Sequence, residues 1–243
     1  MNKYGNKLRS ALQYCSMAFL AFFLVAAAQA QTPVTASTEA HADRITPPPV
    51  PAEIQVEAGN ELFLVGHGVG TQNYACVPCD TSKPGCPAAG VVFSLFTPQA
   101  TLFSDNGKQL ITHFSSPNPF ETNTDATVAA GGLIRVTWQH SQDTSRVWAK
   151  AIGTATSSTD PQFVRQGAIP WLKLQVKDVG ALAGPTGGNK LTGTTFIQRV
   201  NTFGGLAPAG CTSTADLGKK AFVPYTADYL FYKAAGRDGR NDY

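Results

Sequence analysis

The sequence is poor in charged residues, and no surplus of either sign remains after its first nine residues. Charged side chains make up 14% of the 243 residues, with 19 basic and 16 acidic. Lys3, Lys7 and Arg9 account for the whole difference. Proteins that bind nucleic acids need a cationic surface to displace phosphate counterions, and anionic membranes attract proteins through the same charges. The composition therefore argues against both partners.

The sequence also lacks the short motifs that identify common enzymes. It contains no G-x-S-x-G nucleophile elbow, no H-E-x-x-H zinc motif and no phosphate-binding loop. The run from Gly66 to Gly70 has the spacing G-x-G-x-G, whereas a dinucleotide-binding loop has G-x-G-x-x-G before a helix. We interpret this run as a β-turn or bulge. The carboxylates are too dispersed to indicate a glycosidase pair.

The four histidines are scattered along the chain, at positions 41, 67, 113 and 140. His41 lies in a segment rich in Thr, Ala and Pro. We interpret the other three as surface residues or as residues whose hydrogen bonds are satisfied, so no metal site and no cofactor are predicted. The alternative is that His67, His113 and His140 converge on a metal, an arrangement that sequence alone does not show.

The first thirty residues have the features of a secretory signal peptide. Three basic residues precede an apolar run from Met17 to Ala28, and small residues stand at Ala28 and Ala30. The run is too short to cross a bilayer, and Ala-x-Ala is typical of a cleavage site. We therefore predict that residues 1–30 are a signal peptide and that the mature protein is secreted or periplasmic, without a membrane span.

The remaining chain divides into three segments. Residues 31–52 are rich in Thr, Ala and Pro, a composition that buries too little apolar surface to offset the entropy lost on ordering. We predict a disordered, partly polyproline linker at 31–52, one folded domain at 53–233 and a flexible tail at 234–243. Because 43% of all residues are hydrophobic and 14 are Phe, the domain has ample material for a core.

Alternating polar and apolar residues, which are typical of strands with one buried face, dominate the domain. Asp105-Asn106-Gly107 is a strong hairpin signal, because Asn and Gly tolerate the positive φ of tight turns. No amphipathic helix of three turns is found. The pattern predicts an all-β single domain, either an antiparallel sandwich or a barrel. The expected strands lie at 61–65, 91–96, 109–114, 133–140, 171–176, 194–200 and 225–232.

Four of the five cysteines follow the signal peptide, at positions 76, 79, 86 and 211. The Cys76-x-x-Cys79 spacing also occurs in redox enzymes, but the Pro- and Gly-containing segment after Cys79 cannot start the helix that such chemistry needs. An oxidising compartment favours disulfides over a zinc site. Four cysteines allow three pairings, of which we favour Cys79 with Cys86 and Cys76 with Cys211.

Two late strands carry polar residues among apolar ones. Gln198 and Arg199 lie on the first, and Tyr225 and Asp228 lie on the second. If these strands pair, Arg199 and Asp228 are expected to form an ion pair that orients the core, which is the interpretation we favour. The other interpretation is a small-molecule pocket at the mouth of a barrel, lined by all four residues.

Several blocks of the domain resemble the family known as domain of unknown function 3455, a group of secreted proteins from bacteria, fungi and plants. In family order, the blocks are 70–76, 98–102, 113–114, 169–174, 197–205 with Cys211, and 224–229. They span nearly the whole folded domain. The resemblance implies export and a β-domain, but it brings no established activity.

The resemblance also concerns individual residues. The family usually carries Glu after Pro98, so Gln99 in this chain weakens any catalytic role there. The Cys79–Cys86 loop looks like an elaboration on a shared pair, which supports pairing Cys76 with Cys211. The candidate residues for a ligand pocket are Gln72, Tyr74, His113, Gln198, Arg199, Tyr225 and Asp228.

The resulting hypothesis is an exported, non-enzymatic β-domain that binds a small molecule, a glycan or a surface partner. Two alternatives remain open. A metal-dependent or acid–base enzyme would bring two or more of the histidines into one cleft with Asp228. A purely structural component of the envelope or matrix would have a filled barrel without a pocket.

Overall fold

A computed structural model describes residues 46–122 and 131–236. Within these ranges the chain consists of strands and loops with two single-turn 3-10 helices, η1 (Ala52–Ile54) and η2 (Thr214–Asp216), and it has no α-helix. None of the helical segments described is long and apolar enough to cross a membrane. The predicted signal peptide at 1–30 lies outside the described residues.

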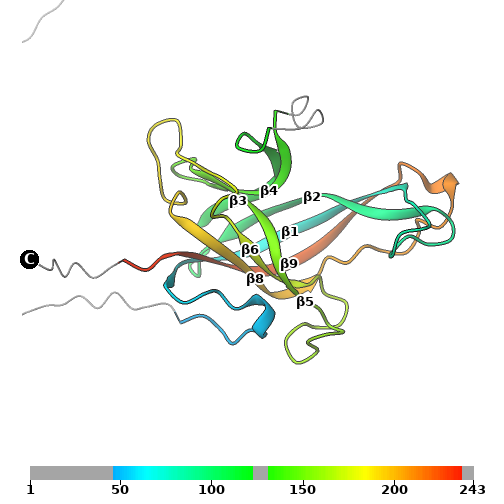
Figure 1. Ribbon diagram of the computed structural model, residues 1–243, viewed down its shortest axis with the longest axis horizontal. Coiled ribbons are helices and arrows are strands. Elements are labelled where there is room, and N and C mark those ends of the chain that lie inside the picture. Colours follow the sequence, from blue (N-terminus) through cyan, green and yellow to red (C-terminus); the bar gives the residue numbers. More distant parts are fainter. Residues whose placement is uncertain (1–45, 123–130, 237–243) are drawn as a thin grey trace, which may run out of the picture. The chain divides into compact units, whose positions relative to one another are not determined.

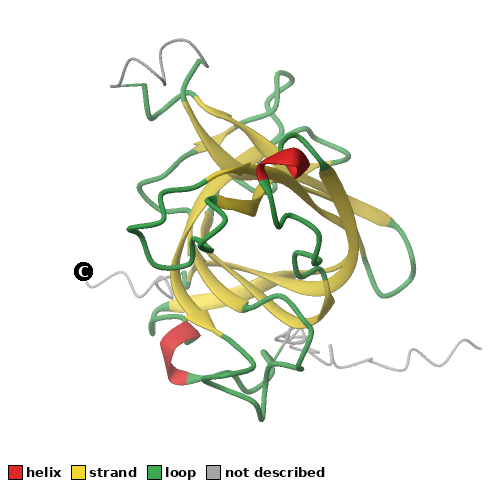
Figure 2. Cartoon of the chain, turned by 90° about the vertical axis from the view of Figure 1, so that its right-hand side faces the viewer, coloured by secondary structure: helices red, strands yellow, loops and turns green. Residues whose placement is uncertain are grey.

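Eight strands close into an antiparallel barrel in the order β1-β2-β3-β4-β5-β6-β8-β9, with β9 pairing back to β1 (Figures 1 and 2). The ninth strand, β7, is short and extends the edge of β5. The sequence left a sandwich and a barrel open, and the structure is a barrel. The strands are β1 (Asn60–Pro78), β2 (Val91–Phe103), β3 (Gln109–Asn118), β4 (Leu133–His140), β5 (Arg146–Ala155), β6 (Trp171–Gln175), β7 (Ala181–Leu182), β8 (Thr194–Gly204) and β9 (Lys220–Ala234).

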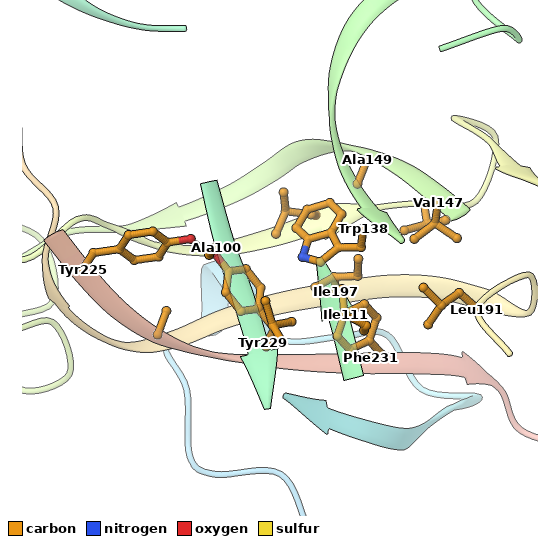
Figure 3. Close-up of a cluster of buried hydrophobic side chains, with 14 of the residues drawn as sticks. Ala100, Ile111, Trp138, Val147, Ala149, Leu191, Ile197, Tyr225, Tyr229 and Phe231 are labelled. Atoms are coloured by element: carbon orange, nitrogen blue, oxygen red, sulfur yellow. Dashed lines mark hydrogen bonds between the residues drawn. The ribbon is translucent and has the colours of Figure 1, made fainter. Parts of the chain in front are cut away.

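Alternating side chains give each strand one face inside the barrel and one face outside. Strand β9 shows this clearly, because Tyr225, Tyr229 and Phe231 belong to the interior core whereas Leu230 belongs to a second cluster. In the interior, Trp138 of β4 packs edge-on against Tyr229 and Phe231, as Figure 3 shows. The aromatic residues that made these strands recognisable in the sequence therefore fill the middle of the barrel.

The glycine run at 66–70 is not a turn, which corrects the interpretation made from the sequence. The run lies within β1, which continues without interruption from Asn60 to Pro78. A side chain at Gly68 would meet the Tyr229 ring at 2.8 Å, and one at Gly66 would meet Leu102 at 3.0 Å. The glycines are therefore positions where side chains of neighbouring strands occupy the space next to the β1 backbone.

A second apolar cluster lies under the segment that leads into β1. Ile54 is fully buried there, Val50 packs against the same cluster, and Pro51 is also buried. Val50 and Pro51, at the end of the linker expected at 31–52, therefore cover part of the barrel, whereas Thr46, Pro47, Pro49 and Ala52 are exposed. This segment is blue in Figure 1. Residues 31–45 and 237–243 lie outside the described part of the chain.

Two disulfides connect the loops at one end of the barrel. Cys76, at the end of β1, bonds to Cys211 in the β8–β9 connection, and Cys79 bonds to Cys86 within the β1–β2 connection. This is the pairing favoured from the sequence. Both cysteines of the Cys76-x-x-Cys79 motif are thus bonded to other partners, so the motif does not form the internal disulfide of a redox enzyme.

Candidate functional site

A cavity of about 440 Å³ lies in the interior, toward the end of the barrel at which β1 leads into β2. All eight barrel strands contribute to its wall, and its volume lies within the usual range for small-molecule sites. The polar residues of the wall include Gln72, Tyr74, His113, Trp138, Arg199 and Tyr229. The apolar residues include Leu95, Pro98, Val136, Ile169, Leu172 and Leu174.

Arg199 projects from β8 into this wall. Its Nε and Nη2 atoms donate hydrogen bonds to the carbonyl oxygen of Pro170, at 3.2 and 2.8 Å. No Asp or Glu of the described residues lines the cavity or forms an ion pair with Arg199. The guanidinium therefore brings a positive charge into the wall that no described carboxylate balances.

His113 lies beside Arg199 in the wall as a neutral ring. Its Nδ1 donates to the carbonyl oxygen of Thr137 at 2.9 Å, and its ring stacks on Trp138 with 4.2 Å between the centroids. Burial lowers the pKa of His113 to about 3, and the charge of Arg199 acts in the same direction. Because Nδ1 carries the proton, Nε2 is left as a hydrogen-bond acceptor.

Three tyrosines surround the same space. The hydroxyl groups of Tyr225 and Tyr229 lie 2.9 Å apart, and the hydroxyl of Tyr74 donates to the carbonyl oxygen of Gly205 at 2.6 Å (Figure 3 shows Tyr225 and Tyr229). Burial raises the pKa of all three phenols, and the charge of Arg199 opposes that rise. The tyrosines are therefore neutral hydrogen-bonding groups at physiological pH.

Two buried N–H groups of the wall have no hydrogen-bond partner among the described residues. They are Nε2 of Gln72 and Nε1 of Trp138, and their side chains are 2% and 1% exposed. An unsatisfied buried donor costs about 1–3 kcal/mol, and such groups are rare in folded proteins. Two further buried atoms without a partner, Oδ1 of Asn73 and Nε1 of Trp171, do not line the cavity, and all four are shielded by the packed barrel.

The comparison with protein families matches the part of the chain that forms the barrel. A family model described as "Protein of unknown function (DUF3455)" matches residues 57–233. The chain belongs to this family. No curated protein and no solved structure matches it. The part of this DUF3455 protein that the family model covers contains every residue of the cavity wall. The family resemblance inferred from the sequence is confirmed.

The structure divides the pocket residues predicted from the sequence into two groups. Gln72, Tyr74, His113 and Arg199 line the cavity, and Tyr225 adjoins it through its hydrogen bond with Tyr229. The remaining two, Gln198 and Asp228, do not line it. Gln198 donates to the carbonyl oxygen of Ile54 and accepts from the hydroxyl of Tyr232, so it holds the N-terminal segment against the barrel.

The predicted ion pair between Arg199 and Asp228 is wrong. In the register of β8 and β9, Arg199 stands opposite Tyr229, and Asp228 stands opposite Val200. Neighbouring positions on a strand face opposite sides of the sheet, so the guanidinium lies inside the barrel and the carboxylate outside. Asp228 instead accepts hydrogen bonds from His67 and Asn201, both at 2.7 Å.

Sequence reasoning missed Trp138 and Tyr229 as residues of the wall. Trp138 pairs with His113 across β3 and β4, and Tyr229 pairs with Arg199 across β8 and β9. The available signal was their parity within the strands, because each lies an even number of residues from a neighbour that faces inward. Without the pairing register, that signal does not say which parity is the inner one.

The three histidines considered for a metal site do not meet. His113 lies inside the barrel, His67 lies on its outer surface between Asp105 and Asp228, and His140 lies near the β4–β5 turn with its Nδ1 3.3 Å from Asp143. Across 46–122 and 131–236, no group of three or more His, Cys, Asp or Glu residues is arranged to hold a metal.

His67 provides a pH-dependent link between three elements of the barrel. Hydrogen bonds to Asp228 and then to Asp105, each 2.7 Å long, raise its pKa above the ordinary value of 6.5. A raised pKa in the folded state adds stability below the unfolded pKa, and this stability is lost as pH rises through the folded value.

We therefore expect the difference in Tm between the wild-type protein and His67→Gln to be largest near pH 5.5 and to shrink toward pH 9. Thermal unfolding across this range, measured by circular dichroism on both proteins, checks the expectation. A difference that stays constant with pH would show that the two carboxylates do not hold the protonated ring.

Proposed function

We propose that this protein is an exported binding module that holds one small, largely apolar molecule in the cavity of its barrel. The observation that carries the proposal is a cavity of about 440 Å³ that is walled by all eight strands of the barrel and contains the guanidinium of Arg199. A barrel with a purely structural role is expected to fill its interior with side chains, because unfilled space reduces stability.

The chemistry of the wall supports binding over catalysis. General acid–base catalysis works best when the pKa of the catalytic group is close to the working pH. The pKa of His113 is lowered to about 3, so its ring is a poor base, and the buried phenols are poor acids because burial raises their pKa. These groups are suited to donating and accepting hydrogen bonds without changing their protonation state.

The balance of polar and apolar groups favours a small molecule over a glycan. Most of the residues between the polar groups are aliphatic, among them Leu95, Val136 and Leu172. A larger open hollow of about 920 Å³ borders residues 176–181 and 192–196, but none of the unpartnered buried donors lies in it. The two disulfides are consistent with the exported location that the proposal includes.

A matched pair of variants on β5 tests the proposal. Ala151 lines the cavity at its exposed mouth, whereas the next residue, Ile152, is also exposed but does not line it. The probe is N-phenyl-1-naphthylamine, an uncharged dye that fluoresces in apolar surroundings. We expect one dye to bind per wild-type chain. Ala151→Trp should weaken this binding at least tenfold, and Ile152→Trp should leave it within about twofold.

The dye titration of Ile152→Trp is the control for Ala151→Trp. Both substitutions place a tryptophan on an exposed position of one strand, so an effect on stability alone should change the two variants alike. If the dye fails to bind the wild-type protein, or if it binds both variants equally, the interior cavity is not the binding site and the proposal fails.

A further inference from the structure

The charges around the cavity have one sign. Its wall contains three basic residues, Arg199, Lys150 and Arg135, and no acidic residue among those described. Arg135 is bonded to Glu121, with Nη2 2.7 Å from the carboxylate, so its charge is balanced. Lys150 is exposed at the mouth. Arg199 is thus the cation of the interior, and the described residues leave it without a carboxylate.

The neighbours of Arg199 do not replace the missing anion. The positive charge of Arg199 lowers the pKa of four neighbouring side chains, all of which are uncharged at physiological pH. These are Tyr74, His113, Tyr225 and Tyr229. The guanidinium donates from Nε and Nη2 to the carbonyl oxygen of Pro170, and it also hydrogen-bonds the neutral hydroxyl of Tyr229. A partly buried cation without an anion is unfavourable, and an anionic group in the cavity would relieve that cost.

The shape of the Arg199 guanidinium points to the same chemistry. A carboxylate offers two acceptor oxygens and matches the planar fork of a guanidinium. A single unbalanced cation suits a monoanion better than a phosphate monoester, which carries nearly two charges.

We propose that the ligand is a monocarboxylic acid with an apolar body, whose carboxylate lies at Arg199 and whose body lies among Leu95, Val136, Leu172 and Leu174. This inference rests on the proposed function and adds the class of ligand and its orientation. Leu172 stands opposite Arg199 in the register of β6 and β8, so the apolar body would begin directly beside the guanidinium.

Three molecules with one tail and different head groups test the inference. They are 4-phenylbutanoate, 4-phenylbutan-1-ol and 4-phenylbutylammonium, each measured by its ability to displace N-phenyl-1-naphthylamine from the wild-type protein. We expect the acid to bind at least tenfold more tightly than the alcohol, because hydrogen bonds to a charged group are stronger than neutral ones. The ammonium ion should bind least, since it meets Arg199 with the same charge.

Variants of Arg199 then test whether this side chain causes the preference for the acid over the alcohol. Arg199→Gln should remove the preference for the acid over the alcohol. Arg199→Lys, which keeps the charge but not the planar fork, should retain part of the preference. Lys150→Gln should reduce it by less than Arg199→Gln, because Lys150 is exposed to solvent.

A pH titration of the wild-type protein gives a second test that needs no variant. Affinity for the acid should fall below about pH 4.5, where the ligand takes up a proton, and affinity for the alcohol should not. His113 stays neutral in this range because its pKa is about 3, and the phenols stay neutral as well. The hydrogen bond from Arg135 lowers the pKa of Glu121, so this carboxyl loses its charge at a lower pH than a free glutamate does.

The outcomes separate the two proposals. If acid and alcohol bind equally and Ala151→Trp weakens both, the cavity binds small molecules but the acid inference is overturned. The same conclusion follows if Arg199→Gln keeps the wild-type preference. If none of the three molecules displaces the dye, and the dye does not distinguish Ala151→Trp from Ile152→Trp, the proposed function itself fails.

Discussion

Replacing both Cys76 and Cys211 with alanine is expected to lower the free energy of unfolding by about 4–5 kcal/mol. The bond joins residues 135 positions apart, so its loss frees a long loop of the unfolded chain. Domains of this size have a total stability of about 5–15 kcal/mol, and the variant should therefore be close to unfolding at 37 °C. Urea denaturation of the two oxidised proteins measures the difference.

The second disulfide is the control for this prediction. Cys79 and Cys86 are seven positions apart, and replacing both should cost only about 2 kcal/mol by the same loop-closure argument. Both variants lose one disulfide, so differences in oxidation during folding affect them alike. Equal losses, or a larger loss for the short loop, would contradict the view that the Cys76–Cys211 bond restricts the unfolded chain most.

Gly70→Ala is expected to lower the free energy of unfolding by about 3 kcal/mol or more, or to prevent folding. An added Cβ would lie 2.1 Å from the carbonyl oxygen of Gln99 and 2.5 Å from the Cα of Ala100. Both atoms belong to the backbone of β2, which cannot move aside as a flexible side chain can. Strands β1 and β2 would have to separate where they form the wall of the barrel.

A glycine with free space around it provides the comparison. No atom lies within 4 Å of the position that a Cβ would take at Gly193, and its backbone conformation is one that alanine adopts readily. Gly193→Ala should therefore change stability by no more than about 0.5 kcal/mol. Chemical denaturation of both variants and the wild-type protein measures these differences in the free energy of unfolding. A Gly70→Ala protein with an unchanged midpoint would contradict the close pairing of β1 and β2.

The strands with aromatic and β-branched alternation could be predicted from sequence alone, and others could not. Strand β4 has the bounds expected for it, and the Asp105-Asn106-Gly107 turn joins β2 to β3, with φ of +77° at Gly107. Strand β5 was missed, because its Ala, Lys and Gly residues have low strand propensity. Its neighbours β4 and β6 hold it in place.

The glycine run in β1 was misinterpreted for a related reason. Glycines at alternate positions are an ordinary signal for a turn, and they were interpreted as one. Their actual role depends on Tyr229, about 160 residues later, which occupies the space beside Gly68. A contact of that sequence separation leaves no local pattern, so only the folded structure shows why a side chain is missing there.

Part of the site could be predicted from the sequence. Polar residues on or near the expected strands could be collected as a group, and four of them, Gln72, Tyr74, His113 and Arg199, do line the cavity. Sequence could not decide which face of each strand is the inner one. That is why Asp228 was placed beside Arg199, although a one-residue difference in position puts the two on opposite faces.

Native mass spectrometry of the protein isolated from its own host, compared with Ala151→Trp, tests directly whether the barrel holds a ligand. We expect the wild-type protein to carry one noncovalent molecule of a few hundred daltons that dissociates as an acid, and Ala151→Trp, which narrows the mouth of the cavity, to carry much less of it. Equal ligand content in the two proteins would show that the interior of this barrel is not a binding site.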